Sequence, residues 1–315
     1  MSEAVKFIQH IKNTVAGAKD SKVIVTGGSY GGFLTTVLKM NHPDVFFGAI
    51  PFAAPLRSIG SNNQNPQRYE WFKWANQTYR DLSASAANKM KHALKYSTSD
   101  FKPSIAKDFN LCSVPETVID LQTIMALINT AAYLIPQGSY NNPIANPTGA
   151  SAQKLVNTTL HLTDPTQIIN ATLMTYYPPS SYPCIEWNST QSDNPTPANE
   201  IPAGTVFVPT SIQTETDPYT RETLYDIVAP TQEYVETKYH ITPDELVQAK
   251  RILFAYNEMD PTTAVGIDPL PITQDRNASR YMFTSLSAHG EGVIASYPGD
   301  KPSVVHARQV QLQTI

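Results

Sequence analysis

The sequence predicts an α/β fold with a mostly parallel β-sheet and a large helical insertion in the middle of the chain. Near both ends, short β-branched segments alternate with helical periodicity. Between residues 57 and 242 this alternation stops, and helical patterns follow one another without strands between them. We therefore expect a sheet domain formed by residues 1–56 and 243–315, with residues 57–242 inserted as a helical cap.

The N-terminal part shows the order helix, strand, tight turn, helix, strand. Apolar residues at helical spacing predict an amphipathic helix over residues 2–18. The β-branched run 22–26 is typical of a buried parallel strand. Two glycines and a second helix follow, which ends at His42-Pro43, and residues 46–50 form the next predicted strand.

The middle of the chain has helical and loop patterns, whereas the C-terminal part again alternates helices with strands. Residues 66–131 are predicted to be helical, 136–151 and 188–205 to be loops, and 219–239 to be helical again. Thr242-Pro243 with Glu245 has the residue types of a helix start. Strands are expected at 251–256 and 281–285, and a final helix opens at 306–310.

Composition excludes some function classes. The net charge is -4 and the sequence has no basic run, so we expect no nucleic-acid partner. No apolar stretch approaches the roughly 18 residues that a membrane span needs. No cofactor and no metal are expected. Cys112 and Cys184 form one bridge or are both free, and the sequence does not choose between these states.

The segment Gly27-Gly28-Ser29-Tyr30-Gly31 lies between a predicted strand and a predicted helix. Glycine permits a sharp turn that projects the serine hydroxyl above the sheet edge. The amide of Tyr30, at the helix start, would then stabilise an oxyanion. The alternative is a phosphate-binding turn, but that fingerprint places its glycines at other spacings.

A serine nucleophile needs a histidine base and an orienting carboxylate later in the chain. Of the seven histidines, His289 directly follows a predicted strand near the C-terminus. Asp260 follows the strand that ends at residue 256, and Asp268 and Asp275 are the alternatives. The order Ser, Asp, His predicts an α/β-hydrolase fold with acyl-enzyme catalysis by Ser29, Asp260 and His289.

These residues resemble the serine peptidase family of lysosomal prolyl carboxypeptidase, dipeptidyl peptidase II and fungal prolyl endopeptidases. Residues 27–32 match its nucleophile motif, 257–261 its aspartate loop and 288–289 its histidine loop. Residues 109–112 and 184–186 are similar to landmarks of its helical insertion. The resemblance implies a secreted, lysosomal or vacuolar glycoprotein that hydrolyses peptides, typically after proline.

Three positions depart from the family pattern. Thr262 stands where the family usually has a tryptophan that walls the proline pocket, and Phe33 stands where a methionine is common. Glu291 precedes Gly292, where the family tends to place an aspartate. We take Phe33, Thr262 and Glu186 as candidate substrate contacts, and for Glu186 a structural ion pair or a solvated acid is the alternative.

Five sequons suggest glycosylation, at Asn76, Asn157, Asn170, Asn188 and Asn277. The N-terminus does not resemble a signal peptide. In this fold four strands precede the nucleophile, whereas only 28 residues precede Ser29, so we expect a truncated member of the family. An esterase or lipase of the same fold and a non-catalytic relic are the alternative functions. The sequence does not determine the oligomeric state, and a homodimer is one of the states compatible with it.

Overall fold

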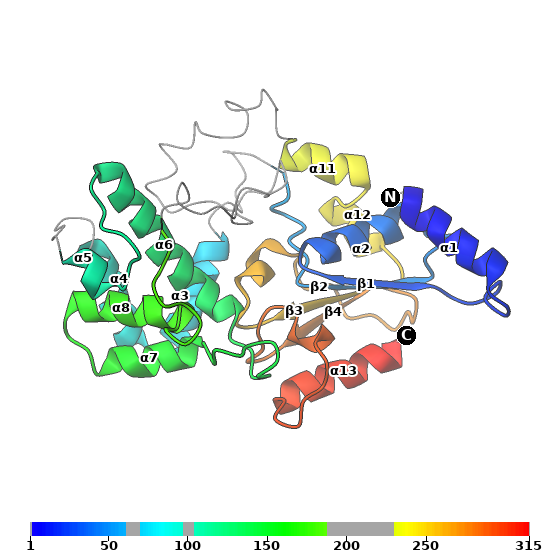
Figure 1. The fold of residues 1–315 in the computed structure, drawn as a ribbon. Coiled ribbons are helices and arrows are strands. Elements are labelled where there is room, and N and C mark those ends of the chain that lie inside the picture. The colour runs from blue at the N-terminus through cyan, green and yellow to red at the C-terminus, as the bar shows by residue number, and fades with distance from the viewer. Residues whose placement is uncertain (1, 61–69, 97–103, 188–229, 315) are drawn as a thin grey trace. The chain divides into compact units, whose positions relative to one another are not determined.

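The computed structural model describes residues 2–60, 70–96, 104–187 and 230–314 (Figure 1). The chain divides into two compact units, one formed by residues 1–68 and 230–315 and the other by residues 69–229. The sequence patterns predict the corresponding boundaries at 56 and 243. That the helical unit serves as a cap stays a prediction.

The first unit is built on four strands in the order β1-β2-β3-β4, and each neighbouring pair is parallel. They are β1 (Ile24–Gly28), β2 (Gly48–Phe52), β3 (Leu253–Asn257) and β4 (Arg280–Thr284). Helices lie against this parallel sheet, which is the α/β-hydrolase type of architecture that the sequence predicts.

The strand limits differ from the predicted ones by one or two residues. β1 takes in both glycines of the motif, because Gly27 pairs with Pro51 and Gly28 with Phe52 across the ladder. β3 begins only at Leu253, because Arg251 has a left-handed backbone with φ 59° that cannot continue a strand. Pairing with the neighbouring strand and the local backbone conformation thus determine where each of these strands begins and ends.

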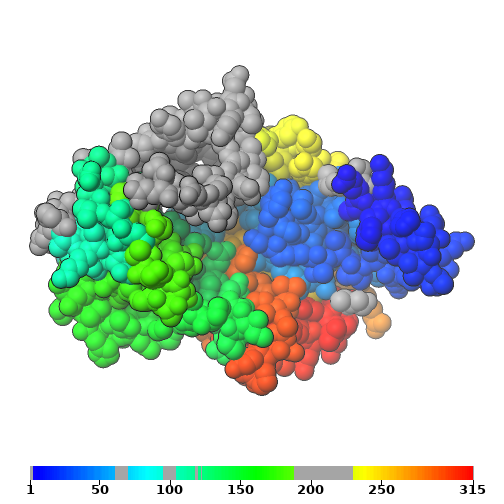
Figure 2. Space-filling model, viewed as in Figure 1, coloured from blue at the N-terminus to red at the C-terminus, as the bar shows by residue number. Residues whose placement is uncertain are grey.

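Helices on both faces of the sheet complete the first unit. They are α1 (Ser2–Thr14), α2 (Tyr30–Asn41), α11 (Gln232–Tyr239), α12 (Pro243–Gln248) and α13 (Pro302–Thr314), with short 3-10 helices η3 (Pro261–Val265) and η4 (Glu291–Val293). Figure 1 shows α2 and α12 on one face and α13 on the other. The helix predicted over 2–18 ends at Thr14, and α1 lies at the surface in Figure 2.

The core of this unit has two parts, one on each face of the sheet. On the α2 face, Phe33 and Val37 pack with Leu246 of α12 and with Phe254 and Tyr256 of β3. The opposite face buries alternate residues of the strands: Ile50, Phe52, Leu253 and Ala255. Successive side chains of β3 point to opposite faces of the sheet, so this strand contributes to both parts of the core.

The predicted helix start at Thr242 is confirmed as a capping box. The Thr242 hydroxyl accepts a hydrogen bond from the amide of Glu245, and the Glu245 carboxylate accepts one from the amide of Thr242, at 3.0 Å. The predicted helix over 219–239 is described only from residue 230 onward, where α11 forms. Residues 219–229 of that prediction lie outside the described residues, as does the predicted loop 188–205.

The second unit is helical. Its helices are α3 (Glu70–Leu82), α4 (Ala84–Tyr96), α5 (Ile105–Asp108), α6 (Val118–Gln137), α7 (Ala152–Leu160) and α8 (Pro165–Tyr176). The first four agree with the helical prediction for 66–131, of which residues 66–69 and 97–103 lie outside the described residues. Helices α7 and α8 lie within the insertion predicted to be helical, but the sequence patterns give no separate bounds for them. In the described ranges no helix combines the length and apolar character that crossing a bilayer requires.

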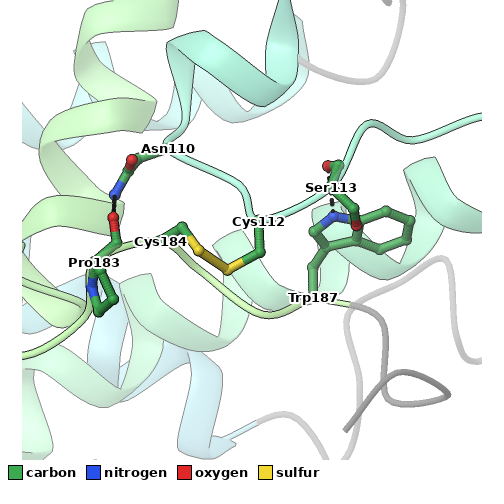
Figure 3. Close-up of a disulfide and its surroundings, with 6 residues drawn as sticks. All are labelled: Asn110, Cys112, Ser113, Pro183, Cys184 and Trp187. Atoms are coloured by element: carbon green, nitrogen blue, oxygen red, sulfur yellow. Dashed lines mark hydrogen bonds between the residues drawn. A yellow bond between two sulfur atoms is a disulfide. The ribbon is translucent and has the colours of Figure 1, made fainter.

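A disulfide between Cys112 and Cys184 joins two segments of the helical unit (Figure 3). Beside it, the amide of Cys112 donates to the carbonyl of Ile185 at 3.0 Å, and Asn110 Nδ2 donates to the carbonyl of Pro183 at 3.1 Å. The indole of Trp187 donates to the carbonyl of Ser113 at 2.9 Å. The bridge and these bonds hold the two segments together.

Helix α2 lies unusually close to the strands that flank it. A Cβ on Gly32 would lie 2.7 Å from the carbonyl oxygen of Phe52 and 3.0 Å from the Cβ of Ala54. A Cβ on Gly27 would lie 2.5 Å from the carbonyl oxygen of Gly31. The absence of side chains at these two positions therefore sets the distance between helix and sheet.

We predict that Gly32→Ala lowers the free energy of unfolding by about 1–3 kcal/mol, because the methyl group overpacks this contact. The matched control is Gly31→Ala, whose Cβ meets no described atom within 4 Å. The control should leave the free energy of unfolding unchanged or raise it by up to about 1 kcal/mol. Urea unfolding of both variants measures the difference, and equal effects would contradict the packing argument.

Candidate active site

Ser29 occupies the turn between β1 and α2. Its backbone has φ 56° and ψ -124°, a conformation that non-glycine residues rarely adopt. The amide of Ser29 donates to the carbonyl of Phe52 at 2.9 Å, and the carbonyl of Ser29 accepts from the amides of Gly32 and Phe33. Strain of this kind persists where surrounding structure enforces it, which is common at functional sites.

The amide of Tyr30 opens helix α2 directly after this serine. The first amides of a helix have no acceptor within the helix, and the helix dipole adds partial positive charge there. An oxyanion that develops beside Ser29 would meet such donors. This geometry is compatible with the oxyanion role expected for Tyr30.

Asp260 and His289 form a hydrogen-bonded pair. His289 Nδ1 lies 2.8 Å from Asp260 Oδ2. Asp260 follows β3 and is fully buried, and His289 follows β4 with 17% of its side chain exposed. The second carboxylate oxygen of Asp260 accepts from the amide of Thr262 at 3.0 Å, so both oxygens have partners.

The two opposing effects on His289 leave its pKa above the ordinary value. Burial, the larger single effect, works to lower the pKa of His289 because it disfavours the charged ring. The charge of Asp260 and its hydrogen bond act in the other direction and together outweigh burial. Asp260 therefore stabilises an imidazolium at this position.

Ser29, Asp260 and His289 lie at the same edge of the sheet. Each follows the carboxyl end of a strand, β1, β3 and β4 respectively, and the strands run parallel. The other two aspartate candidates have different partners. Asp268 binds Arg57, and Asp275 binds Lys250 at 2.9 Å. Of the three, Asp260 is the one hydrogen-bonded to His289.

The comparison with known families gives a match over the N-terminal part of the chain. Residues 1–192 match the family described as serine carboxypeptidase S28. The chain belongs to that family. Membership in S28 places it among the serine peptidases, and the first of the three candidate residues, Ser29, lies within the matched residues.

Individual relatives of the S28 family match a shorter stretch. Lysosomal Pro-X carboxypeptidase from Homo sapiens is 38% identical over 56 residues, which is 18% of this chain and 11% of the relative. The protein of the same name from Bos taurus has the same identity and coverage, and that from Mus musculus is 36% identical. The aligned stretch thus spans about a tenth of the length of these relatives.

The candidate substrate contacts occupy different environments. Phe33 is buried in the core on the α2 face and stacks on Tyr30, with ring centroids 5.6 Å apart. Thr262 is buried, and its hydroxyl lies 3.5 Å from His289 Nδ1. Glu186 belongs to the helical unit and is an exposed neighbour of the disulfide. A contact of any of them with substrate stays a prediction.

The sequons fall on both units. Asn76, Asn157 and Asn277 are exposed, whereas Asn170 is half-buried with an enclosed side-chain oxygen. Asn188 lies outside the described residues. Asn277 is also a hydrogen-bond partner of Arg251, whose Nε lies 3.0 Å from its side-chain oxygen. Glycosylation at these positions stays a prediction.

Sequence reasoning missed the residues that hold the His289 loop. Asn257 lies at the end of β3 and is buried, and its side chain reaches Ser287 and Gly290. Glu291 is also fully buried and accepts from the amide of Ala288 at 2.9 Å. The signals in the sequence are the place of Asn257 in the aspartate loop, 257–261, and the place of Glu291 two residues after His289.

We predict that Asp260→Asn lowers the pKa of His289 below its ordinary value, because burial then acts without the opposing carboxylate. Histidine ring NMR as a function of pH measures this, with assignment by loss of the signal in His289→Gln. An unchanged pKa in the folded Asp260→Asn variant would contradict the pairing.

The same shift predicts a pH dependence of stability. Because the pKa of His289 is raised on folding, its stabilising contribution is fully present below about pH 6.5, the unfolded value, and is lost as pH rises through the folded pKa. The difference in unfolding free energy between the chain and His289→Gln should shrink over that interval. A difference that grows with pH would mean that the folded protein favours the neutral ring.

Proposed function

We propose that this protein is a serine peptidase in which Ser29 attacks the peptide carbonyl. His289 accepts the serine proton and returns it to the leaving amine, and Asp260 holds the imidazole in the productive tautomer. The amide of Tyr30 stabilises the oxyanion of the tetrahedral intermediate. The acyl-enzyme on Ser29 is then hydrolysed by water, with the same histidine as the base.

The single observation that carries the proposal is the buried Asp260–His289 pair at the sheet edge where Ser29 lies. A neutral imidazole must take the proton, and Asp260 favours the charged ring that results. The strained backbone of Ser29 and the membership in the S28 family support the same assignment.

The substrate is proposed to be a peptide cleaved after proline, with exopeptidase action. This rests on the name of the relatives, Pro-X carboxypeptidase, and on the resemblance of the motifs. Their name also supports a lysosomal location, and the Cys112–Cys184 bridge agrees with an oxidising compartment or with secretion. The helical unit is proposed to act as a cap.

We predict that a fluorophosphonate probe labels Ser29 of the chain and that Ser29→Ala abolishes labelling. The labelling rate should rise with pH through the raised pKa of His289, because only the neutral ring can act as a base. Thr26→Ala is the matched control, since it removes a hydroxyl from β1, the strand before the turn, where Thr26 donates to the carbonyl of Ile50. Equal labelling of Ser29→Ala would exclude Ser29 as the nucleophile.

The substrate proposal has its own test. Peptides with proline before the scissile bond should be hydrolysed faster than the same peptides with alanine there, and ester substrates separate a peptidase from an esterase. If Ser29 is labelled but only esters are turned over, the nucleophile assignment stands and the peptidase assignment falls. A chain that folds cooperatively and neither labels nor hydrolyses would be the non-catalytic relic.

A further inference from the structure

Asn257 connects the loop that carries Asp260 to the loop that carries His289. Its side-chain oxygen accepts from the amide of Gly290 at 3.2 Å, and its side-chain nitrogen donates to the Ser287 hydroxyl at 2.6 Å. Ser287 lies two residues before His289, and Gly290 lies directly after it. One side chain from the end of β3 therefore contacts a side-chain hydroxyl before the histidine and a backbone amide after it.

The chemistry of these bonds requires a carboxamide. A backbone amide can only donate, so the Gly290 amide fixes which end of Asn257 is the acceptor. The Ser287 hydroxyl already donates to the carbonyl of Thr284 at 2.7 Å, so it offers a lone pair to Asn257. A carboxylate lacks the donor for this second bond, and an apolar side chain lacks both groups.

The surroundings make this arrangement rigid. Asn257 and Ser287 are both buried, so each polar group left without a partner there carries a desolvation cost. The main chain of Asn257 is fixed by the Thr263 hydroxyl, which donates to its carbonyl at 2.7 Å. Thr263 belongs to η3, the 3-10 helix that Asp260 caps. Asn257 is thereby connected to Asp260 through its main chain and to the residues around His289 through its side chain.

A second set of bonds acts on the residues just before the histidine. The Glu291 carboxylate accepts from the amide of Ala288 at 2.9 Å, and the amide of Met259 donates to the carbonyl of Ser287 at 3.0 Å. The Glu291 bond closes the loop on itself, whereas the Asn257 side chain links the residues around His289 to the end of β3, just before the loop of Asp260. The His289 ring can hold a 2.8 Å bond to Asp260 only while both loops keep their positions.

We infer that Asn257 is a positioning residue that holds His289 against Asp260 through Ser287 and Gly290. The inference rests on the proposed function for its catalytic consequence, since it deepens the account of the same site. The effect of Asn257 on the geometry of the Asp260–His289 pair does not depend on catalysis. It can therefore be tested without any enzyme activity.

The experiment is histidine ring NMR of the 315-residue chain and of the variants Asn257→Ala, Ser287→Ala and the double variant. Asn257→Ala should move the pKa of His289 downward and weaken the Nδ1 proton signal of the bond to Asp260. Ser287→Ala should produce a smaller shift in the same direction. The double variant should match Asn257→Ala, because the Ser287 contribution passes through Asn257.

The matched control is Asn41→Ala. Asn41 also bridges two elements, because its side-chain nitrogen donates to the carbonyls of Val37 and Tyr239 at 2.9 and 2.7 Å. Its loss should lower stability without moving the pKa of His289. An equal shift in Asn41→Ala would reduce the Asn257 effect to general loosening and overturn the inference.

Other outcomes are equally decisive. A folded Asn257→Ala variant with the pKa and proton signal of the parent chain overturns the inference, as does a double variant with additive shifts. If Asn257→Ala does not fold, Ser287→Ala decides alone, and an unchanged pKa there counts against the inference.

The fluorophosphonate labelling rate separates the inference from the proposed function. In Asn257→Ala it should fall by on the order of 10²-fold, the cost of a misplaced catalytic group. If the parent chain is not labelled but its His289 responds to Asn257, the proposed function fails and the positioning role stands. If labelling is Ser29-dependent and unaffected by Asn257→Ala, the positioning role fails and the proposed function stands.

Discussion

The junction between β2 and β3 is the constraint on which the rest of the sheet unit depends. Phe52 pairs with Ala255 there, the amide of Ala49 donates to the carbonyl of Arg251, and the amide of Ala53 donates to the carbonyl of Ala255. These bonds join the two segments of the chain that flank the helical unit. Only across this junction do Ser29, from the first segment, and Asp260 and His289, from the second, share one sheet edge.

Two different kinds of constraint position the groups at that edge. Ser29 is held by close contact of backbones, because Gly32 lets α2 approach the end of β2 and the Ser29 amide bonds to Phe52. His289 is held by buried side-chain polar groups, those of Asp260, Asn257 and Glu291. Steric fit is insensitive to pH, whereas the polar set surrounds the His289 ring, whose pKa is raised and whose charge changes with pH. The two halves of the site should therefore respond differently to changes of solution conditions.

Much of the fold could be predicted because its signals are local. Four strands, helix α2 and the cap at Thr242 follow from β-branched runs, glycines and capping residues that are close in the sequence. The strand ends were shifted because pairing partners decide them, and α7 and α8 were not bounded separately within a segment of weak resemblance. The sequence does not determine the pairing of Cys112 with Cys184, because only the fold brings these distant residues together.

The same distinction holds within the site. Ser29, Asp260 and His289 could be selected because each follows a predicted strand in the order that the fold requires. Asn257 could not, since its role depends on partners 30 and 33 residues further along the chain. Glu291 was noticed only as a departure from a pattern, although it bonds the residue before His289. Polar networks of this kind have no periodicity from which to infer them.

The β2–β3 junction also has a consequence for biosynthesis. Because Phe52 and its partner Ala255 are about 200 residues apart, a ribosome that adds 5–20 residues per second needs roughly 10 to 40 s to deliver the partner. Throughout that interval β2 presents an open edge to other chains in the cell. The helical unit emerges from the ribosome during the same interval. Its folding rate therefore determines how much unfolded chain is present while the edge of β2 is unpaired. Chaperone demand should therefore concentrate on the nascent chain before β3 is made.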